Sequence, residues 1–151
     1  MKDTLQSKRL LVVDDDPEVL ALTTKVLRSL PDREVVACDN PWQALDVFMG
    51  DPESFEMLVT DFNMPSLDGI ELSRRLHSQS PQLHVLLISG GGLETADMIC
   101  AGLDAFLSKP WRAEELLEVV RSVLANETDN EGRRALRQPQ GGPRPLANEG
   151  P

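Results

Sequence analysis

The chain has 151 residues and a 40% hydrophobic share, which excludes disorder throughout and predicts one domain with a buried core. No apolar run is long enough to span a membrane and residues 1–4 do not open a signal peptide, so we expect a soluble, cytoplasmic protein. The net charge of −10 argues against nucleic acid as a direct partner, because such binding needs clustered lysine and arginine.

Five short apolar runs alternate with five helical patterns along the chain. The first run ends at Asp14-Asp15-Asp16, and Pro17 then suits the first turn of a helix, where its missing N–H costs nothing. Asn40 and Pro41 form another such start, a capping side chain followed by proline. The expected strands are 10–13, 34–38, 57–60, 84–89 and 105–108. The expected helices are 17–30, 41–50, 69–80, a weak one that carries Ala96, Ile99 and Cys100 and ends at Gly102, and 112–125.

The helical patterns also predict which side chains point into the core, because apolar residues three or four positions apart share one helix face. The expected inward residues are Val19, Leu20, Leu22, Val26, Leu27 and Leu30; Ala44, Leu45 and Phe48; Leu72 and Leu76; and Leu116, Val119, Val120 and Val123. His77 and His84 fall near a helix end and a strand start, and we expect both at the surface. Cys38 and Cys100 lie far apart with no C-x-x-C motif, so we expect buried free thiols.

Strand–helix alternation of this kind requires right-handed crossovers and a parallel sheet that helices cover on both faces. The expected fold class is therefore α/β. The natural solution is a doubly wound, flavodoxin-like (β/α)5 domain with a five-stranded parallel sheet in the order 2-1-3-4-5.

The pattern stops near residue 126. The segment 126–151 holds four of the 11 prolines and four of the 10 glycines but few apolar side chains, so it cannot offset its ordering entropy. Its four acidic residues cancel its four arginines, and the whole net charge of −10 therefore belongs to 1–125. We expect a folded domain over 1–125 and a disordered tail over 126–151, in which Arg133 and Arg134 belong to a solvated linker rather than a docking patch.

Polar residues follow four of the predicted strands. Asp14 and Asp15 follow the first, Asp61 follows the third, Ser89 ends the fourth and Lys109 follows the fifth. In a parallel sheet these ends share one edge, and the order 2-1-3-4-5 brings strands one and three together at the switch point, where ligands bind. Asp61 taken alone is as readily a turn cap, so the prediction depends on the whole set.

The set indicates a phosphoryl-transfer site. Clustered carboxylates disfavour one another's ionisation, and a hard cation with oxygen ligands relieves this repulsion, which suits Mg²⁺. Lys109 supplies one positive charge and Ser89 one hydroxyl donor, which together can hold the oxygens of a transferring phosphoryl group. Asp61 is then the natural nucleophile.

Four motifs in this order resemble those of the receiver domain of two-component response regulators. They are Leu11-Val12-Val13-Asp14-Asp15-Asp16; Thr60-Asp61-Phe62-Asn63-Met64-Pro65 with Asp68-Gly69; Ile88-Ser89-Gly90; and Phe106-Leu107-Ser108-Lys109-Pro110-Trp111. The resemblance covers residues 8–125 and implies that 1–125 is a receiver domain. It also implies that the chain catalyses only its own phosphorylation and dephosphorylation.

By this resemblance Asp61 is the phosphoacceptor, which takes a phosphoryl group from the phosphohistidine of a histidine kinase or histidine phosphotransfer protein. Asp15 resembles the direct Mg²⁺ ligand, with Asp14 acting largely through water. Asn63 would lend its backbone carbonyl to the metal. Asp16 is expected to cap the first helix rather than to bind metal.

The resemblance also implies a conformational switch. Ser89 matches the switch hydroxyl, Lys109 the family's lysine, and Phe106 the aromatic residue whose rotamer follows phosphorylation. Lys109-Pro110 resembles the family's cis peptide. The surface formed by the fourth helix, fifth strand and fifth helix would then control a downstream protein partner that the sequence does not name.

Three features depart from the family pattern. The spacing from Ser89 to Lys109 is shorter than expected, the run Gly90-Gly91-Gly92 makes the loop after the fourth strand unusually free, and Trp111 stands where Phe is more usual. All three fall on the face used for signalling.

Two other readings remain open. A haloacid-dehalogenase-like phosphatase would use Asp14 and Asp16 in a D-x-D motif, but it leaves the motif around Asp61 unexplained and the chain has no cap domain. An interaction module of the same fold that is never phosphorylated would have to retain a costly carboxylate cluster for no purpose. The sequence does not distinguish a stand-alone regulator from a fragment of a hybrid kinase.

Overall fold

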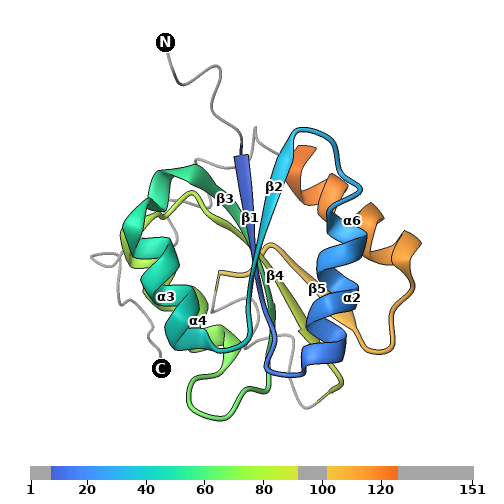
Figure 1. The fold of residues 1–151 in the computed structure, drawn as a ribbon, viewed down its shortest axis with the longest axis horizontal. Coiled ribbons are helices and arrows are strands. Elements are labelled where there is room, and N and C mark those ends of the chain that lie inside the picture. The colour runs from blue at the N-terminus through green and yellow to red at the C-terminus, as the bar shows by residue number, and fades with distance from the viewer. Residues whose placement is uncertain (1–7, 92–101, 126–151) are drawn as a thin grey trace, which may run out of the picture.

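Five parallel strands form one sheet in the order β2-β1-β3-β4-β5. The computed structural model describes residues 8–91 and 102–125 (Figure 1). The strands are β1 (Lys8–Val13), β2 (Arg33–Cys38), β3 (Phe55–Asp61), β4 (His84–Ser89) and β5 (Ala105–Ser108). The helices are α2 (Pro17–Leu27), α3 (Pro41–Gly50), α4 (Gly69–Gln79) and α6 (Ala113–Ala125), with a 3-10 turn η1 (Pro52–Ser54). The predicted α/β fold and its strand order are confirmed.

Helices cover both faces of this sheet. Figure 1 shows α3 and α4 on one face and α2 and α6 on the other. Leu10 and Val12 of β1 pack in the apolar cluster that includes α2 and α6, whereas Leu11 and Val13 pack in the cluster that includes α3 and α4. All four side chains are at most 1% exposed. Burial on both faces explains why the strand is a continuous apolar run rather than an alternating one.

Polar side chains begin three of the helices, as predicted for Asp16 and Asn40 and found in addition for Asp68. Asp16 Oδ1 accepts the backbone N–H of Glu18 at 3.0 Å, Asn40 Oδ1 accepts that of Gln43 at 2.8 Å, and Asp68 Oδ1 accepts that of Glu71 at 2.8 Å. These bonds satisfy N–H groups that have no partner inside the helix. Asp16 is therefore a helix cap.

The predicted inward face of the first helix is partly wrong. Leu22 is 51% exposed, and the buried residues of α2 are Thr23, Thr24 and Leu27. Thr23 is tolerated inside because its hydroxyl donates to the carbonyl of Val19 at 2.8 Å. The prediction used only apolar residues and ignored threonine. It therefore assigned Leu22 to the buried face in place of Thr23 and Thr24. The helix also ends at Leu27 rather than near residue 30. Beyond it, the N–H groups of Ser29 and Leu30 donate to carbonyls three residues back rather than four, which is the pattern of a 3-10 turn.

The prediction that both histidines lie at the surface is wrong. His77 and His84 are 3% and 4% exposed. His77 Nε2 lies 2.9 Å from the carbonyl oxygen of Leu83, and His84 Nδ1 lies 3.5 Å from Asp104 Oδ1. The carbonyl of Leu83 compensates the burial of the His77 ring, whereas Nδ1 of His84 has the Asp104 carboxylate nearby but makes no hydrogen bond within the described residues.

Cys38 is a buried free thiol, as predicted, and burial raises its pKa to about 11, with the charge of Asp39 adding to the effect. The predicted helix through Ala96, Ile99 and Cys100 and the predicted disordered tail 126–151 lie outside the described residues. Within the described ranges, none of the helices combines the length and apolar composition that crossing a membrane requires.

Candidate functional site

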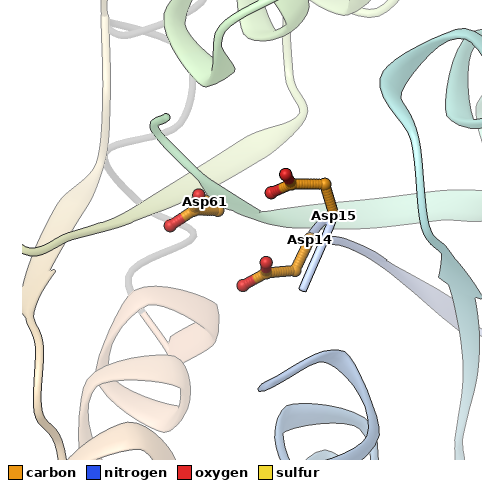
Figure 2. A group of neighbouring side chains, drawn as sticks. All are labelled: Asp14, Asp15 and Asp61. Carbon is orange, nitrogen blue, oxygen red and sulfur yellow. The ribbon is translucent and has the colours of Figure 1, made fainter. Parts of the chain in front are cut away.

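The ends of β1 and β3 bring three carboxylates together. The two strands pair in parallel with Val13 opposite Thr60, so Asp14 and Asp61 follow at neighbouring positions of the same edge. The side chains of Asp14, Asp15 and Asp61 each offer an oxygen, and these oxygens lie within 4.8 Å of one another (Figure 2). An all-oxygen donor set fits Mg²⁺, which usually takes one or two carboxylates and completes its shell with water or phosphate oxygens.

Close packing at the start of α4 holds the backbone of Asp61 in place. The N–H of Phe62 donates to the carbonyl of Ile88 at 2.9 Å, and the N–H of Gly69 donates to the carbonyl of Phe62 at 2.9 Å. A Cβ on Gly69 would lie 2.4 Å from the carbonyl oxygen of Asp61, so a side chain at position 69 does not fit. The helix therefore approaches the strand end closely enough to fix the loop between them.

The carboxyl group of Asp14 is buried next to two other acidic side chains. It is 5% exposed, and its Oδ1 accepts the backbone N–H of Asp16 at 2.9 Å. Burial raises the pKa of Asp14 to about 6, and the charges of Asp61 and Asp15 add to the rise, although the Asp16 hydrogen bond and Lys109 oppose it. A bound cation would remove this unfavourable balance.

Lys109 places one cation against the cluster. Its Nζ lies 2.7 Å from Asp61 Oδ1 and 4.0 Å from Asp14 Oδ2. Burial acts to lower the pKa of Lys109, but the hydrogen bond and the charge of Asp61 outweigh it, and the pKa is raised overall. The ammonium therefore stays protonated. The peptide between Lys109 and Pro110 is cis, as the resemblance implied.

Ser89 is buried beside this site and turned toward its own loop. It is 0% exposed, its Oγ donates to the carbonyl of Gly91 at 2.9 Å, and it accepts the N–H of Gly91 at 3.0 Å. Phe106 is opposite Leu87 in the pairing of β4 with β5 and packs with the small cluster of Ile70 and Leu87. Ser89 and Phe106 therefore occupy adjoining parts of the same pair of strands.

Asn63 is exposed in the loop after β3, two positions beyond Asp61. Its carbonyl as a metal ligand stays a prediction. Asp16, which the phosphatase reading requires, is engaged in capping α2 and stands outside the carboxylate group. Its position removes the second acid of that D-x-D pair.

Sequence reasoning missed an apolar hollow beside the site. It has a volume of about 440 Å³ and is lined by Val19, Leu22, Lys109, Pro110 and Trp111. The signal was present, since Trp111 follows the lysine directly and Leu22 carries an apolar side chain on a helix that starts at the site. The hollow was missed because Leu22 was predicted to lie in the core.

Fold and site together define a doubly wound α/β protein with an acidic, lysine-bridged site at the switch point of its sheet. The sequence profile described as the response regulator receiver domain matches residues 10–121. The chain belongs to this family.

Relatives with known sequences and structures agree with this membership. The chain is 36% identical over 120 residues to the response regulator MprA of Mycobacterium bovis, covering 78% of this chain and 51% of that protein. It is 34% identical over 126 residues to MprA of Mycolicibacterium vanbaalenii, covering 82% and 53%. The crystal structure of a CheY-like response regulator receiver domain protein from Methanospirillum hungatei has a TM-score of 0.72 and 26% identity, covering 82% of this chain and 98% of that one.

The chain spans about half the length of the two MprA proteins, and 19% of a putative two-component response regulator, ARR21, of Arabidopsis thaliana.

Proposed function

We propose that Asp61 accepts a phosphoryl group from the phosphohistidine of a histidine kinase or histidine phosphotransfer protein, with Mg²⁺ held by Asp14, Asp15, Asp61 and the backbone carbonyl of Asn63. The observation that carries the proposal is the 2.7 Å contact between Lys109 Nζ and Asp61 Oδ1 inside a group of three carboxylates. Mg²⁺, when bound, supplies positive charge for the phosphoryl oxygens.

The chemistry is an in-line displacement at phosphorus. A carboxylate oxygen of Asp61 attacks the phosphorus, the new O–P bond forms as the P–N bond breaks, and the imidazole of the donor leaves with the electron pair and takes up a proton. Lys109 holds one oxygen of Asp61 and carries a fixed charge toward the transferring group. The carboxylates of Asp14 and Asp61 repel each other at the strand ends. A bound cation would offset this repulsion before the phosphoryl group adds further negative charge.

Ser89 then couples phosphorylation to the surface. A phosphoryl group on Asp61 needs donors for its oxygens, and Ser89 can donate only after it leaves Gly91. Its departure frees space beside Phe106, which rotates inward and changes the surface of β5 and α6. The third part of that predicted surface is the helix predicted through Ala96, Ile99 and Cys100, which lies outside the described residues.

The proposed partners are a phosphodonor and a downstream protein. The apolar hollow lined by Val19, Leu22, Pro110 and Trp111 opens beside Lys109 and suits a docking protein that delivers phosphohistidine to Asp61. A structure described as a putative two-component system response regulator/GGDEF domain protein is 28% identical to this chain.

The proposal is tested by incubating the full chain with a small phosphodonor and Mg²⁺, followed by mass spectrometry of the intact protein and of its peptides. One hydroxylamine-labile phosphoryl group on Asp61 is expected, and Asp61→Asn should abolish it. Mg²⁺ should also raise the melting temperature by mass action. A label that persists in Asp61→Asn or maps to Asp14 would favour the phosphatase reading. A phosphotransfer profile against candidate histidine kinases would then identify the physiological donor.

A further inference from the structure

Trp42 connects three segments around the loop that follows β3. It lies in the first turn of α3 and is 45% exposed. Its indole Nε1 donates to the hydroxyl of Ser66 at 2.8 Å, and the guanidinium carbon of Arg75 lies 5.3 Å from its ring centroid. Ser66 belongs to the loop between Asp61 and α4, and Arg75 belongs to α4. One side chain of α3 thus contacts both the loop and the helix that follows it.

The same loop is anchored from inside at two other points. Met64 and Leu67 are 7% and 8% exposed and pack in the core cluster with Ala44 and Phe48 of α3. Ser66 lies between these two anchors and faces outward, where Trp42 reaches it. The indole therefore restrains the side of the loop that the core does not hold.

The loop that Trp42 restrains at Ser66 also carries Asn63, three residues earlier. Phe62 is tied to β4 through its N–H, and Met64 is held in the core, so Asn63 is placed by its neighbours on both sides. Mg²⁺ requires near-ideal octahedral geometry, so a ligand on a loose loop contributes less affinity than one that is held before the metal arrives.

We propose that Trp42 is a positioning residue: through its hydrogen bond to Ser66 it holds the loop 62–68 in the conformation that presents the Asn63 carbonyl to Mg²⁺. The inference rests on the proposed function of the Asp61 site. A single hydrogen bond between neutral groups changes an equilibrium by about twofold to tenfold, so loss of the indole donor should weaken Mg²⁺ binding by that factor.

The test is Mg²⁺ affinity of the full chain, measured calorimetrically, beside the melting temperature without metal. Trp42→Phe keeps an aromatic ring for Arg75 and removes the N–H, and Ser66→Ala removes the acceptor. Each should weaken Mg²⁺ binding by about twofold to tenfold, and the double variant should be no weaker than either single one, because both remove the same bond. Ser66→Thr keeps the hydroxyl and should restore wild-type affinity.

The control is Met49→Ala, which changes another exposed apolar residue of α3, 50% exposed. Its Mg²⁺ affinity and its metal-free melting temperature should both stay close to those of the wild type. Two results would overturn this inference but not the proposed function. In the first, the wild type binds Mg²⁺ and Trp42→Phe and Ser66→Ala bind it equally well. In the second, the losses of the two single variants add in the double variant. A wild-type chain that does not bind Mg²⁺ would overturn the proposed function as well.

Discussion

The hydroxyl of Ser89 is held by both polar groups of the Gly91 backbone, at 2.9 Å from its carbonyl oxygen and 3.0 Å from its nitrogen. Gly91 has a φ of +138°, a conformation that glycine adopts readily and other residues rarely do. The hydroxyl of Ser89 is thus engaged within its own loop in this structure. Leaving Gly91 is a step that any switch through Ser89 must include.

The first prediction concerns that step. With a beryllofluoride phosphate mimic and Mg²⁺, backbone amide shifts should spread from Asp61 through Ser89 and Phe106 to residues near Trp111. Ser89→Ala should keep the shifts around Asp61 and lose those at Phe106 and Trp111, because no hydroxyl links the two regions. Ser108→Ala is the control, since Ser108 is opposite Ser89 in the strand pairing but is exposed. Distant shifts that survive in Ser89→Ala would disprove this coupling.

The second prediction concerns pH. The pKa of Asp14 is raised from 3.8 to about 6 in the folded chain, mainly by burial. Between these values the folded state binds more protons than the unfolded state, so the contribution of Asp14 to stability is best below about pH 4 and is lost as pH rises through 6. Asp14→Asn removes this loss and should raise the free energy of unfolding at pH 7 by about 1–3 kcal/mol in metal-free buffer.

Urea unfolding of Asp14→Asn and wild type at pH 4, 5, 6 and 7, with a chelator present, measures this difference. The gap between the two proteins should widen with rising pH. A constant gap would mean that Asp14 titrates normally in the folded chain. With Mg²⁺ present, the wild type should become more stable as pH rises rather than less stable. The reason is that Mg²⁺ binding should weaken as pH falls below 6 and Asp14 takes up a proton.

The third prediction concerns Lys109. Lys109→Ala leaves Asp61, which is 6% exposed, without its cation and should lower the free energy of unfolding by about 1–3 kcal/mol. The same change should tighten Mg²⁺ binding, because one positive charge leaves the site, and should slow phosphorylation of Asp61. Chemical unfolding, metal titration and phosphorylation rates check the three effects. Lys109→Arg, which keeps the charge, should show smaller changes in stability and metal affinity; equal effects in both variants would exclude the charge as their cause.

The fourth prediction concerns the approach of α4 to β3. Gly69→Ala forces a Cβ to 2.4 Å from the Asp61 carbonyl oxygen and should destabilise the chain by about 1–3 kcal/mol or more. It should also weaken Mg²⁺ binding, because the strand end that carries Asp61 must shift. Gly50→Ala is the matched control, since its added Cβ meets nothing within 4 Å and Gly50 ends a helix. Thermal melts in which Gly69→Ala behaves like Gly50→Ala would contradict the observed packing.

The fifth prediction concerns docking of the phosphodonor. Leu22→Asn should slow phosphotransfer from a cognate kinase by about tenfold, because an exposed apolar contact beside the site is lost, and should leave phosphorylation by a small phosphodonor unchanged. Met49→Asn, an equally exposed change on α3, should alter neither rate. Equal slowing with both phosphodonors would place the effect of Leu22 inside the site rather than at a docking surface.

The parts of this protein that its sequence determined by itself are those that depend on neighbours along the chain. The caps at Asp16 and Asn40, with proline after each, were correctly predicted because a capping side chain bonds to N–H groups two or three residues away. The strand runs and the placement of Asp61 at a strand end were likewise predictable, since a strand buried on both faces must be apolar until it reaches the edge.

The tertiary structure decided what depends on packing between distant segments. No periodic pattern encodes the 2.7 Å contact from Lys109 to Asp61, the turn of Ser89 toward Gly91 or the bond from Trp42 to Ser66, since each follows from side-chain directions after the layers have packed. The burial of His77 and His84 and the exposure of Leu22 show the same limit. A pattern of apolar residues records an average preference for burial, whereas the partners that permit a histidine inside, or leave a leucine outside, come from other elements of the fold.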